Sequence, residues 1–369
     1  MADAILSGYY GQRNAGDDAF LVICAWHARR HFGIDRIYAT APPSRLMRKL
    51  VVRPIYHRFP DHGILNYALA GWKARKVDSI IFGGGSIFHS LEGIERATKW
   101  VRGAGPGRHF AVGVSIGPFD NAEAEAACAS LLTKLDFIGV RDRISYRRGR
   151  ALAPAARVEL TFDLAPLLLE MIEGDLLDRT SPRRGVGVAL RSFEQLLGGQ
   201  RDRAESRIEI IADAIRRCAA RRMIEEIVLI DFNGHKRRGD HRVHQDLKDR
   251  LQSCTRIRHV HYTDNPIDTM RVVASLRAII AMRLHAAIFG FCTHTPVLML
   301  AYHEKCREWA GMIGLPNALR ADALKSTTRD LAESIEWLLG ESVLAPTLPL
   351  ETAVQAAMKN WKWSEAAVM

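Results

Sequence analysis

Long apolar runs and a secretory leader are both missing from this sequence of 369 residues. No stretch reaches the roughly 18 uninterrupted apolar residues that a membrane span requires. The start, MADAILSGYYG, has no basic segment followed by a long apolar one, as a secretory leader would. These absences argue against a transmembrane or exported chain. They predict a cytoplasmic protein, with contact at the inner face of the cell membrane left open.

Cysteine motifs are missing as well. The six cysteines form no CxxC pair and no cluster with histidine at the spacing of a zinc site. We therefore expect reduced thiols within the core and no metal. Sequence repeats and low-complexity tracts are also absent. The composition, 48% hydrophobic and 25% charged, is ordinary for a globular chain long enough for about two domains.

Acidic residues are too few to balance the basic ones, so the net charge is +11 and the isoelectric point is near 9.6. Such a balance favours phosphates, acidic sugars, anionic lipid headgroups or nucleic acid as partners, without choosing among them. The basic stretch FNGHKRRGDHRVHQD (232–246) lacks the interleaved aromatics of a nucleic-acid surface, and Asp240 and Asp246 dilute its charge. We expect a solvated loop and helix start there and no nucleic-acid partner. A second hypothesis is that this charge attracts an acidic, lipid-linked acceptor near a membrane.

Short apolar runs alternate with amphipathic stretches along the whole chain. Continuous β-branched runs bounded by glycine are typical of a parallel sheet covered on both faces. We predict an α/β protein of two Rossmann-like, doubly wound domains that face a cleft, at residues 1–175 and 183–345, with a last helix in 346–369 packing back on the first domain. The strands expected are AILSG, RIYAT, SIIFGGG, HFAVGVS and DFIGVRD in the first domain, and GVGVALR, EEIVLID, RAIIAM and PVLMLA in the second.

Four basic residues stand at or just beyond predicted strand ends. Each has an ordinary explanation as well, because Arg141 can pair with Asp142 or Asp163, Arg191 can be a solvated strand end, and Lys305 can be a surface lysine. Their shared position is nevertheless informative, because the carboxyl ends of strands in this architecture converge on one cleft. The four residues are Arg141, Arg191, Arg283 and Lys305.

The segment IIAMRLHAAIFGF (279–291) is almost entirely apolar, yet it contains Arg283 and His285. A buried arginine without a partner loses several kcal/mol of hydration, so something must compensate its charge. An internal carboxylate would do this. An anionic ligand bound where the strand ends and the helix begins would do it too, and we favour that interpretation because arginine binds phosphate or carboxylate bidentately.

Two glycine-containing turns follow early strands. GYYGQRNAGDD opens a helix that we expect to begin at Asp17, where Asp17 or Asp18 either caps the helix or orients and deprotonates a ligand hydroxyl. Tyr9 or Tyr10 could offer a flat face to a sugar. In FGGGSIFH, the glycines at 83–85 either reverse the chain or bring bare backbone close to a ligand.

Taken in order, these segments resemble the polysaccharide pyruvyl transferases. The resemblance covers nearly the whole chain, and MRLHA is its strongest member; Gln12 departs from the aromatic that often follows GYYG in the family. The segments that carry it are GYYGQRNAGDD, IIFGGGSIF, AVGVSIGP, IGVRDRIS, FDLAP, VGVALR, IIAMRLHAAIF and PVLMLAYHEK.

The resemblance implies a GT-B-like enzyme that takes phosphoenolpyruvate as its donor substrate, with no other cofactor. It would build a pyruvate ketal across two hydroxyls of a saccharide, in an exopolysaccharide, a capsule or a lipid-linked precursor. Arg141, His285 and Lys305 would grip the donor beside Arg283 and Arg191, and Tyr10 would touch the acceptor sugar. Asn14, Gly84 and Gly85 complete the predicted binding residues.

Ketal formation needs proton transfer, and the residues suggest who performs it. The enol carbon must become a methyl group, a sugar hydroxyl must attack C2, phosphate must leave, and a second hydroxyl must close the ring. His285 is the predicted acid. Asp18 or Asp17 is the predicted base, since a helix N-terminus favours the ionised carboxylate.

Two other functions fit the same pattern. A GT-B glycosyltransferase with a nucleotide-sugar donor would share the architecture. A non-catalytic binder of nucleic acid or anionic membrane would share the charge, and it predicts steeply salt-dependent binding that survives loss of Arg283 and His285.

Overall fold

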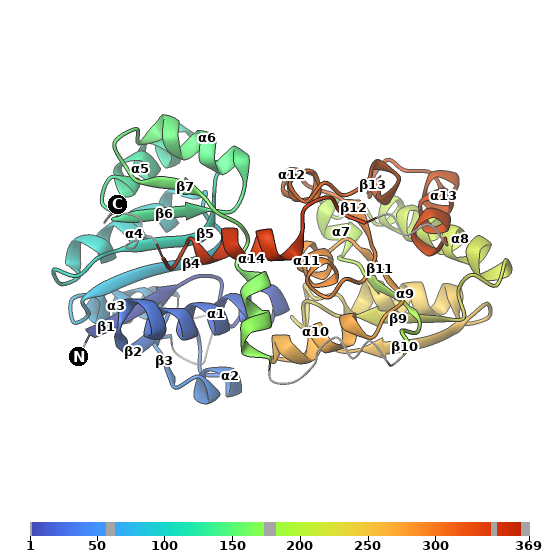
Figure 1. The fold of residues 1–369 in the computed structure, drawn as a ribbon, viewed down its shortest axis with the longest axis horizontal. Helices are drawn as coiled ribbons and strands as arrows, with labels where there is room; N and C mark the ends of the chain where they lie inside the picture. The colour runs from blue at the N-terminus through green and yellow to red at the C-terminus, as the bar shows by residue number, and fades with distance from the viewer. Residues whose placement is uncertain (1, 57–62, 173–181, 341–344, 363–369) are drawn as a thin grey trace. The chain divides into compact units, whose positions relative to one another are not determined.

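The computed structural model describes residues 2–56, 63–172, 182–340 and 345–362. The chain divides into two compact units (Figure 1). Unit 1 comprises Met1–Gln12, Asp17–Leu168 and Glu351–Met369, and unit 2 comprises Arg13–Gly16 and Leu169–Leu350. The connection between the two predicted domains, at 176–182, lies largely outside the described residues. The short segment Arg13–Gly16 belongs to unit 2 although it lies early in the chain, a feature that the sequence did not suggest.

Unit 1 is built on a parallel sheet of order β3-β2-β1-β4-β5-β6-β7. Its strands are apolar and β-branched at the centre and shorter and more polar at the edges, as a sheet covered on both faces requires. The order reverses between β1 and β4, which is the switch point where ligands bind in such sheets. The strands are β1 (Ala2–Ser7), β2 (Ile34–Ala39), β3 (Val52–Pro54), β4 (Ser79–Phe88), β5 (Phe110–Ile116), β6 (Phe137–Val140) and β7 (Val158–Leu160).

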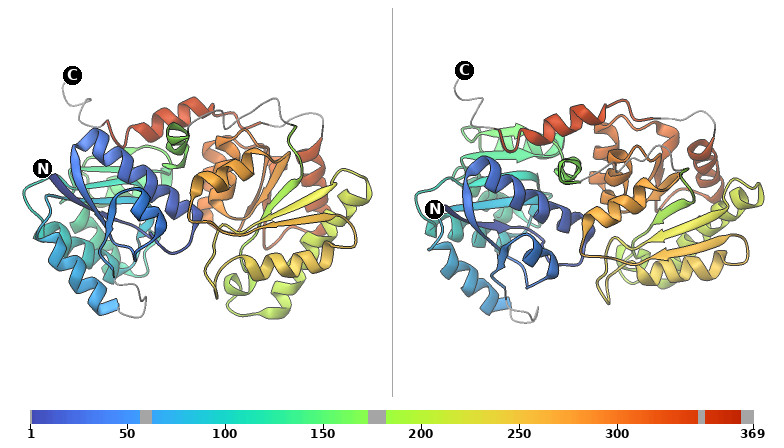
Figure 2. Two further views of the ribbon diagram at one scale, coloured as in Figure 1. Left: turned by 90° about the horizontal axis from the view of Figure 1, so that it is seen from below. Right: turned by 60° about the horizontal axis from the view of Figure 1, so that its bottom comes forward.

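Helices cover both faces of this sheet (Figure 2). Neighbouring helices α3, α4, α5 and α6 pack against one another in sequence. The segment after α14 packs on α1, where the Trp361 ring stacks on His27, and Asn360 accepts the Gly113 N–H at 2.9 Å. The helices of unit 1 are α1 (Ala15–Phe32), α2 (Arg45–Lys49), α3 (Gly63–Ala74), α4 (Leu91–Gly103), α5 (Ala122–Leu132), α6 (Arg143–Leu152) and α14 (Leu350–Met358), and a 3-10 turn, η1 (Ala165–Met171), leads into unit 2.

Unit 2 is a second parallel sheet, of order β10-β9-β8-β11-β12-β13, whose switch point lies between β8 and β11. Helices α8, α9 and α13 pack together, as do α10 and α11. The elements are β8 (Val186–Ala189), α7 (Phe193–Leu196), α8 (Arg201–Ala220), β9 (Glu226–Ile230), α9 (His241–Leu251), β10 (Arg256–Val260), α10 (Pro266–Ala274), β11 (Ala278–Ala281), α11 (Leu284–Cys292), β12 (Val297–Ala301), α12 (Glu304–Met312), η2 (Asn317–Leu319), β13 (Arg320–Asp322) and α13 (Thr328–Leu339). The prediction of two Rossmann-like α/β domains is confirmed.

Two further expectations have a clear outcome. None of the six cysteines, all within the described residues, forms a disulfide, and five are buried, whereas Cys254 is exposed. Among the described residues, no helix has both the length and the apolar character needed to cross a membrane.

Candidate active site

The basic residues of unit 2 stand at the carboxyl ends of three adjacent strands. Ala281 of β11 pairs with Ala189 of β8 on one side and with Met299 of β12 on the other. The residues that follow these strands therefore share one edge of the sheet. Arg191 comes after β8, Arg283 and His285 after β11, and Lys305 after β12, so the structure brings four of the predicted site residues to one edge of unit 2.

Arg283 has an internal carboxylate partner. Its Nε donates to both carboxylate oxygens of Asp240, at 3.0 and 3.1 Å, and its Nη2 donates to Oδ1 as well. Asp240 is fully buried, and its Oδ2 also accepts the Asn233 N–H at 2.9 Å. The sequence left two ways to compensate the charge of Arg283, an internal carboxylate or an anionic ligand. Asp240 is that internal carboxylate. The charge of Arg283 is offset within the protein, and its role toward a donor stays a prediction.

Arg191 and Lys305 differ from Arg283 in this respect. In the part of the chain that the structure describes, no carboxylate lies within ion-pair distance of either residue. The Arg191 guanidinium lies over the Tyr302 ring, with its central carbon 4.7 Å from the ring centroid. Unbalanced positive charge thus remains at the ends of β8 and β12.

His303 lies close to these cations. Burial lowers its pKa, and the nearby cations Lys305, Arg307 and Arg191 lower it further against the opposing effect of Glu304. The lowered pKa favours the neutral form of His303, so His303 adds little to the charge of Arg191 and Lys305. His303 also caps α12, because its side chain accepts the Lys305 N–H at 3.2 Å. Sequence reasoning missed His303 and Tyr302, although both stand in the segment AYHEK that it had singled out.

His285 lies in the first turn of α11 and packs on the segment Arg13–Gly16. A Cβ atom built on Gly16 would lie 1.9 Å from His285 Nδ1, so only glycine fits there. The same segment joins β9 through the Ala15 N–H to Phe232 O bond and the Gly234 N–H to Arg13 O bond, at 2.9 and 2.8 Å. The early GYYGQRNAGDD motif therefore contributes Gly16 to the surroundings of His285.

Replacing Gly16 with alanine is expected to lower the free energy of unfolding by about 1–3 kcal/mol, because the new methyl group must push the His285 ring or the backbone aside. Thermal unfolding of the purified variant measures this. Gly311→Ala is the matched control, since Gly311 lies in α12 with nothing within 4 Å of its added Cβ. If both variants unfolded with the same free energy, the close contact between Gly16 and His285 would not affect the stability of the protein.

Unit 1 contains Arg141, which is 8% exposed and already paired. Its Nη1 donates to Asp163 Oδ2 at 2.9 Å, and its Nε donates to Ser115 Oγ at 2.9 Å. Of the two acids that the sequence offered, Asp163 is the partner, and Asp142 instead caps α6. The charge of Arg141 is therefore offset by Asp163. The convergence of Arg141, His285 and Lys305 on one donor stays a prediction.

The acidic pair of the early motif lies in the first turn of α1. The helix begins at Ala15, two residues before the predicted start, and the Asn14 side chain accepts the Gly16 N–H at 3.1 Å. Neither Asp17 nor Asp18 therefore takes the capping position, which falls to Asn14. Asp18 is buried and Asp17 is partly exposed, so Asp17 is the more accessible of the two candidate bases.

The glycine run lies inside β4 and does not follow it, because the strand continues to Phe88. A Cβ on Gly84 would lie 2.4 Å from the Phe20 ring, whereas one on Gly85 would be 3.8 Å from Tyr9 and 3.9 Å from Asp17. Gly84 thus serves the packing of α1 on the sheet, and its binding role stays a prediction. Gly85 lies beside the residues of the early motif.

Tyr10 is buried in unit 1. Its side chain is 1% exposed, its hydroxyl donates to Gly83 O at 2.8 Å, and burial raises the pKa of its phenol well above the ordinary value. Contact between Tyr10 and an acceptor stays a prediction. Tyr9, the other tyrosine considered from the sequence, is 43% exposed and its hydroxyl meets His89 Nε2 at 2.8 Å.

Tyr9 lines a pocket of about 220 Å³ in unit 1, at the carboxyl ends of β1, β2 and β4. Aromatic rings and hydroxyl or amide groups alternate around it, a combination that suits the apolar faces and hydroxyls of a sugar. The sequence offered only the tyrosines of GYYG as a hint of this pocket. Its lining includes Ser7, Tyr9, Gln12, Thr40, Tyr56, Tyr67, Phe88, Ser90, Arg96 and Trp100.

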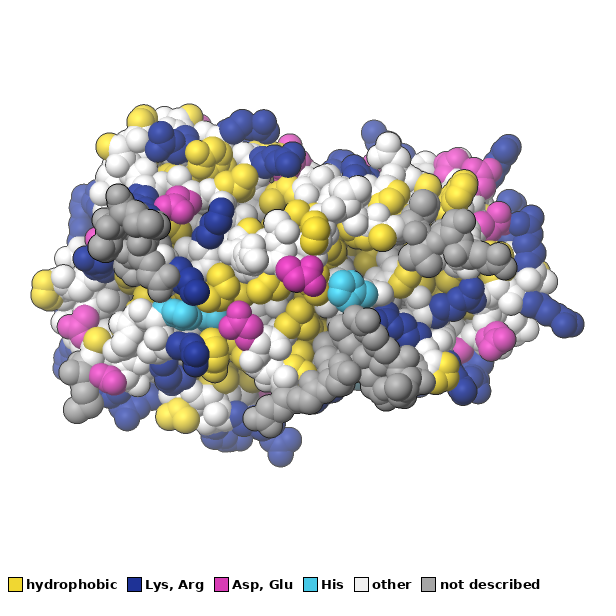
Figure 3. All heavy atoms as spheres, viewed as in Figure 1, with side chains coloured by type: hydrophobic (Ala, Val, Ile, Leu, Met, Phe, Trp, Pro, Cys, Tyr) yellow, Lys and Arg dark blue, Asp and Glu magenta, His cyan; other side chains and the backbone are white. Residues whose placement is uncertain are grey.

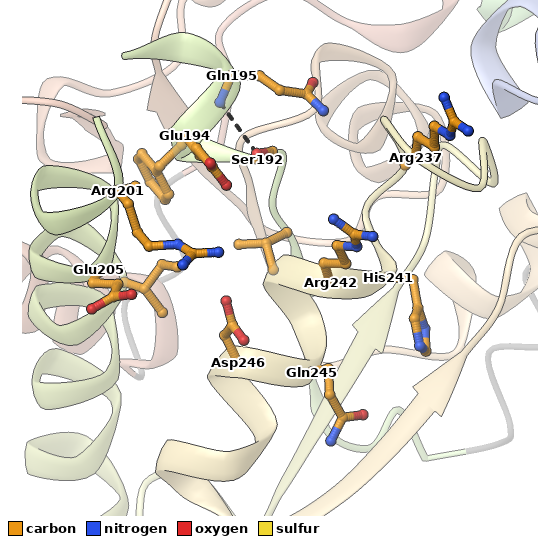
Figure 4. A pocket seen from close by; sticks show the side chains of 15 residues that line it. Ser192, Glu194, Gln195, Arg201, Glu205, Arg237, His241, Arg242, Gln245 and Asp246 are labelled. Atoms are coloured by element: carbon orange, nitrogen blue, oxygen red, sulfur yellow. Dashed lines mark hydrogen bonds between the residues drawn. The ribbon is translucent and has the colours of Figure 1, made fainter. Parts of the chain in front are cut away.

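A second pocket, of about 430 Å³, lies in unit 2 between α7 and the first turns of α8 and α9 (Figure 4). Arg201, Arg242 and Arg237 line it together with Glu194, Glu205 and Asp246. In Figure 4, Arg201 and Asp246 point into the pocket from α8 and α9. Because its charges are balanced, this pocket does not select an anion as the edge near Arg191 and Lys305 does.

The basic loop at 232–246 is a solvated loop followed by a helix start, as predicted. Lys236, Arg237 and Arg238 are exposed, and α9 begins at His241. On the face drawn in Figure 3, Lys and Arg side chains lie scattered among Asp and Glu and form no single continuous patch. The excess charge is therefore spread over this face.

Two parallel-sheet Rossmann-like units, one with cationic side chains and two helix N-termini at one edge of its sheet, have the GT-B type of architecture. The sequence model of the polysaccharide pyruvyl transferases matches residues 14–304, more than half of the chain. The chain belongs to the polysaccharide pyruvyl transferase family, as the sequence resemblance predicted. No curated protein shows a significant match to it.

Solved structures support the architecture. The UDP-GlcNAc 2-epimerase of Neisseria meningitidis, bound to UDP-GlcNAc, has a TM-score of 0.66 at 12% identity and full coverage of both chains. The epimerase of Methanocaldococcus jannaschii scores 0.63 at 13% identity, covering 100% of this chain and 99% of that one. A glycosyltransferase from Rickettsia africae scores 0.55 at 12% identity, covering 98% and 94%. At such identities the likeness shows the fold alone.

Proposed function

We propose that this protein transfers the pyruvyl group of phosphoenolpyruvate onto two hydroxyls of one saccharide, forming a ketal and releasing phosphate. The observation that carries the proposal is the unbalanced charge of Arg191 and Lys305 at the switch-point edge of unit 2. Phosphoenolpyruvate presents a phosphate and a carboxylate, which need cationic and N–H donors. The N-termini of α11 and α12 begin at the same edge and favour an anion there.

The chemical steps follow from these positions. Protonation of the CH2 carbon by His285 makes C2 cationic, and one sugar hydroxyl attacks C2 as its proton passes to a base, for which Asp17 is the accessible candidate. The C2–O bond to phosphate then breaks, and the second hydroxyl closes the ring as its proton passes to His285, which gave up its own proton in the first step. Arg191 and Lys305 stabilise the charge that gathers on the departing phosphate. No step calls for a redox change.

The acceptor saccharide is assigned to the aromatic pocket of unit 1. Tyr9 offers a ring face there, and Gln12, Thr40 and Ser90 offer hydrogen bonds to hydroxyls. The proposed role of Tyr9 replaces the one predicted for Tyr10. Substrate binding would thus use the switch point of each sheet, β1/β4 for the acceptor and β8/β11 for the donor.

Phosphoenolpyruvate is expected to raise the thermal unfolding temperature, and Arg191→Gln and Lys305→Gln are each expected to weaken its binding by roughly tenfold to a hundredfold, as loss of a charged hydrogen bond does. Titration by thermal shift and calorimetry measures both effects. Lys325→Gln, at an exposed lysine of the same unit, is the matched control.

The alternative donor is tested in the same experiment. Stabilisation by UDP-GlcNAc without stabilisation by phosphoenolpyruvate would overturn the proposal in favour of a nucleotide-sugar glycosyltransferase. Binding of phosphoenolpyruvate that is unchanged in both variants would place the donor elsewhere in the protein.

A further inference from the structure

Three histidines and one aspartate gather at the carboxyl ends of β9 and β10. Asp231 directly follows β9, His259 lies in β10, His261 follows that strand, and His241 is the first residue of α9. One ligand atom from each residue can be chosen so that all four atoms lie within 4.8 Å of one another. Exposed acidic clusters are common in proteins, but a set of three imidazoles around a buried carboxylate is not of that kind.

The buried carboxylate forms the floor of this cluster. Asp231 is 4% exposed; its Oδ1 lies 2.8 Å from His259 Nε2, and its Oδ2 lies 3.2 Å from His261 Nδ1 and 3.9 Å from His241 Nδ1. The side chains of His241 and His261 are 60% and 65% exposed. The cluster is thus buried on the side of Asp231 and open to solvent on the side of His241 and His261, which gives an ion a path of entry.

A fourth histidine, His244, holds the Asp231 carboxylate in place. His244 Nε2 accepts the Leu190 N–H at 3.0 Å, so the proton of the neutral ring sits on Nδ1, which donates to Asp231 Oδ1 at 2.6 Å. His244 is fully buried in α9. A ligating carboxylate that is itself hydrogen-bonded in this way is characteristic of metal sites, where such partners hold the ligand in its binding orientation.

The geometry points to a binding site for one divalent transition-metal ion, formed by Asp231, His241, His259 and His261. Imidazole nitrogens with one carboxylate suit Zn²⁺ and its neighbours, whereas Mg²⁺ and Ca²⁺ prefer oxygen ligands. Ligand atoms about 2.0–2.1 Å from Zn²⁺ must lie closer together than they do here. The two exposed rings can rotate inward to close the set, and each ring then binds through the nitrogen that faces Asp231, with its proton on the other nitrogen.

The ion would connect two parts of unit 2. His241 follows Asp240, the partner of Arg283, and Asp231 begins the loop that pairs with the segment Arg13–Gly16. Bound metal would therefore hold the loop between β9 and α9 in the arrangement that keeps Asp240 against Arg283. This inference does not depend on the proposed function, and its test requires no substrate.

Protein without a polyhistidine tag, freed of metal by a chelator, is expected to bind one equivalent of Zn²⁺ with a rise in thermal unfolding temperature, and millimolar Mg²⁺ should not compete. His241→Ala and His261→Ala should each weaken Zn²⁺ binding by at least about tenfold, since even partners one shell further out are worth about 10- to 100-fold. Both positions are exposed, so neither change threatens folding. Co²⁺ should show the absorption of a nitrogen-liganded ion in the parent and lose it in the variants.

His235→Asn is the matched control. His235 is an exposed histidine of the same loop whose Nδ1 accepts the N–H groups of Arg237 and Arg238, an arrangement that asparagine can preserve. It should bind Zn²⁺ as the parent does. Unchanged Zn²⁺ affinity in both alanine variants, an equal loss in the control, or no saturable binding of one equivalent would each overturn the assignment.

Discussion

Replacing His285 with alanine is expected to lower ketal formation by roughly 10²- to 10⁴-fold, the usual contribution of a positioned general acid. The enol carbon must gain a proton before C2 can accept a hydroxyl, and His285 is the proposed donor of that proton. The measurement is the pyruvate content of the surface glycan, by mass spectrometry, in producing cells that carry the variant in place of the parent. A reaction of the purified parent with unlabelled phosphoenolpyruvate in heavy water should place one deuterium in the ketal methyl group.

Two controls separate loss of chemistry from loss of structure. His285→Asn keeps a polar side chain of similar reach against Gly16, and it should retain thermal stability while losing activity. His294→Asn changes an exposed histidine just beyond the other end of α11, at a φ of 51° that asparagine tolerates, and it should keep full activity. A His285→Ala variant with undiminished ketal content contradicts the assigned role.

The long central elements of both sheets could be predicted because their hydrophobic periodicity is strong. In α8, the apolar positions Ile208, Ile211, Ala212 and Ile215 are all buried as their spacing indicates. The strands that the sequence did not reveal are β3, β7, β10 and β13, which all lie at sheet edges. In β10, RIRHV, every residue is partly or fully exposed, so no apolar run marks it.

The missed edge strand explains the missed histidine cluster. His259 and His261 are separated by one residue, and once β10 is known this spacing places them on the same side of an extended chain. Asp231 and His241 come from a different strand and helix, and only the pairing of β9 with β10 brings the four together. Sequence spacing of the kind found in zinc fingers therefore could not indicate the site.

Site residues were predictable by position more reliably than by role. The carboxyl ends of strands could be located from the sequence, so the placement of Arg191, Arg283, His285 and Lys305 at one edge of a sheet was predicted correctly. The sequence could not show which of these cations pairs with an internal carboxylate. Asp240 lies 43 positions from Arg283, and their pairing depends on tertiary folding. The same limit applies to Tyr10, whose buried hydroxyl meets Gly83 and Cys24 of other elements.

The Arg283–Asp240 pair makes the largest predicted contribution to the stability of unit 2. Replacing Asp240 with alanine is expected to lower the free energy of unfolding by about 3–5 kcal/mol, because Arg283, with 15% of its side chain exposed, would lose its counter-charge. The Asn233 N–H would also lose its acceptor. Asp240→Asn restores an acceptor but not the charge, so its loss should be smaller. Urea unfolding with a chelator present measures these changes without any contribution from metal at the adjacent His241.

A double variant tests whether the charge itself is responsible. Asp240→Ala combined with Arg283→Met removes both charges, and it should be more stable than Asp240→Ala alone, since replacing both partners of a buried pair by apolar groups is far less costly than orphaning one. Asp246→Asn, at an exposed position of the same helix, should change stability by no more than about 0.5 kcal/mol. If the double variant were no more stable than the single one, the loss would come from the Asn233 contact.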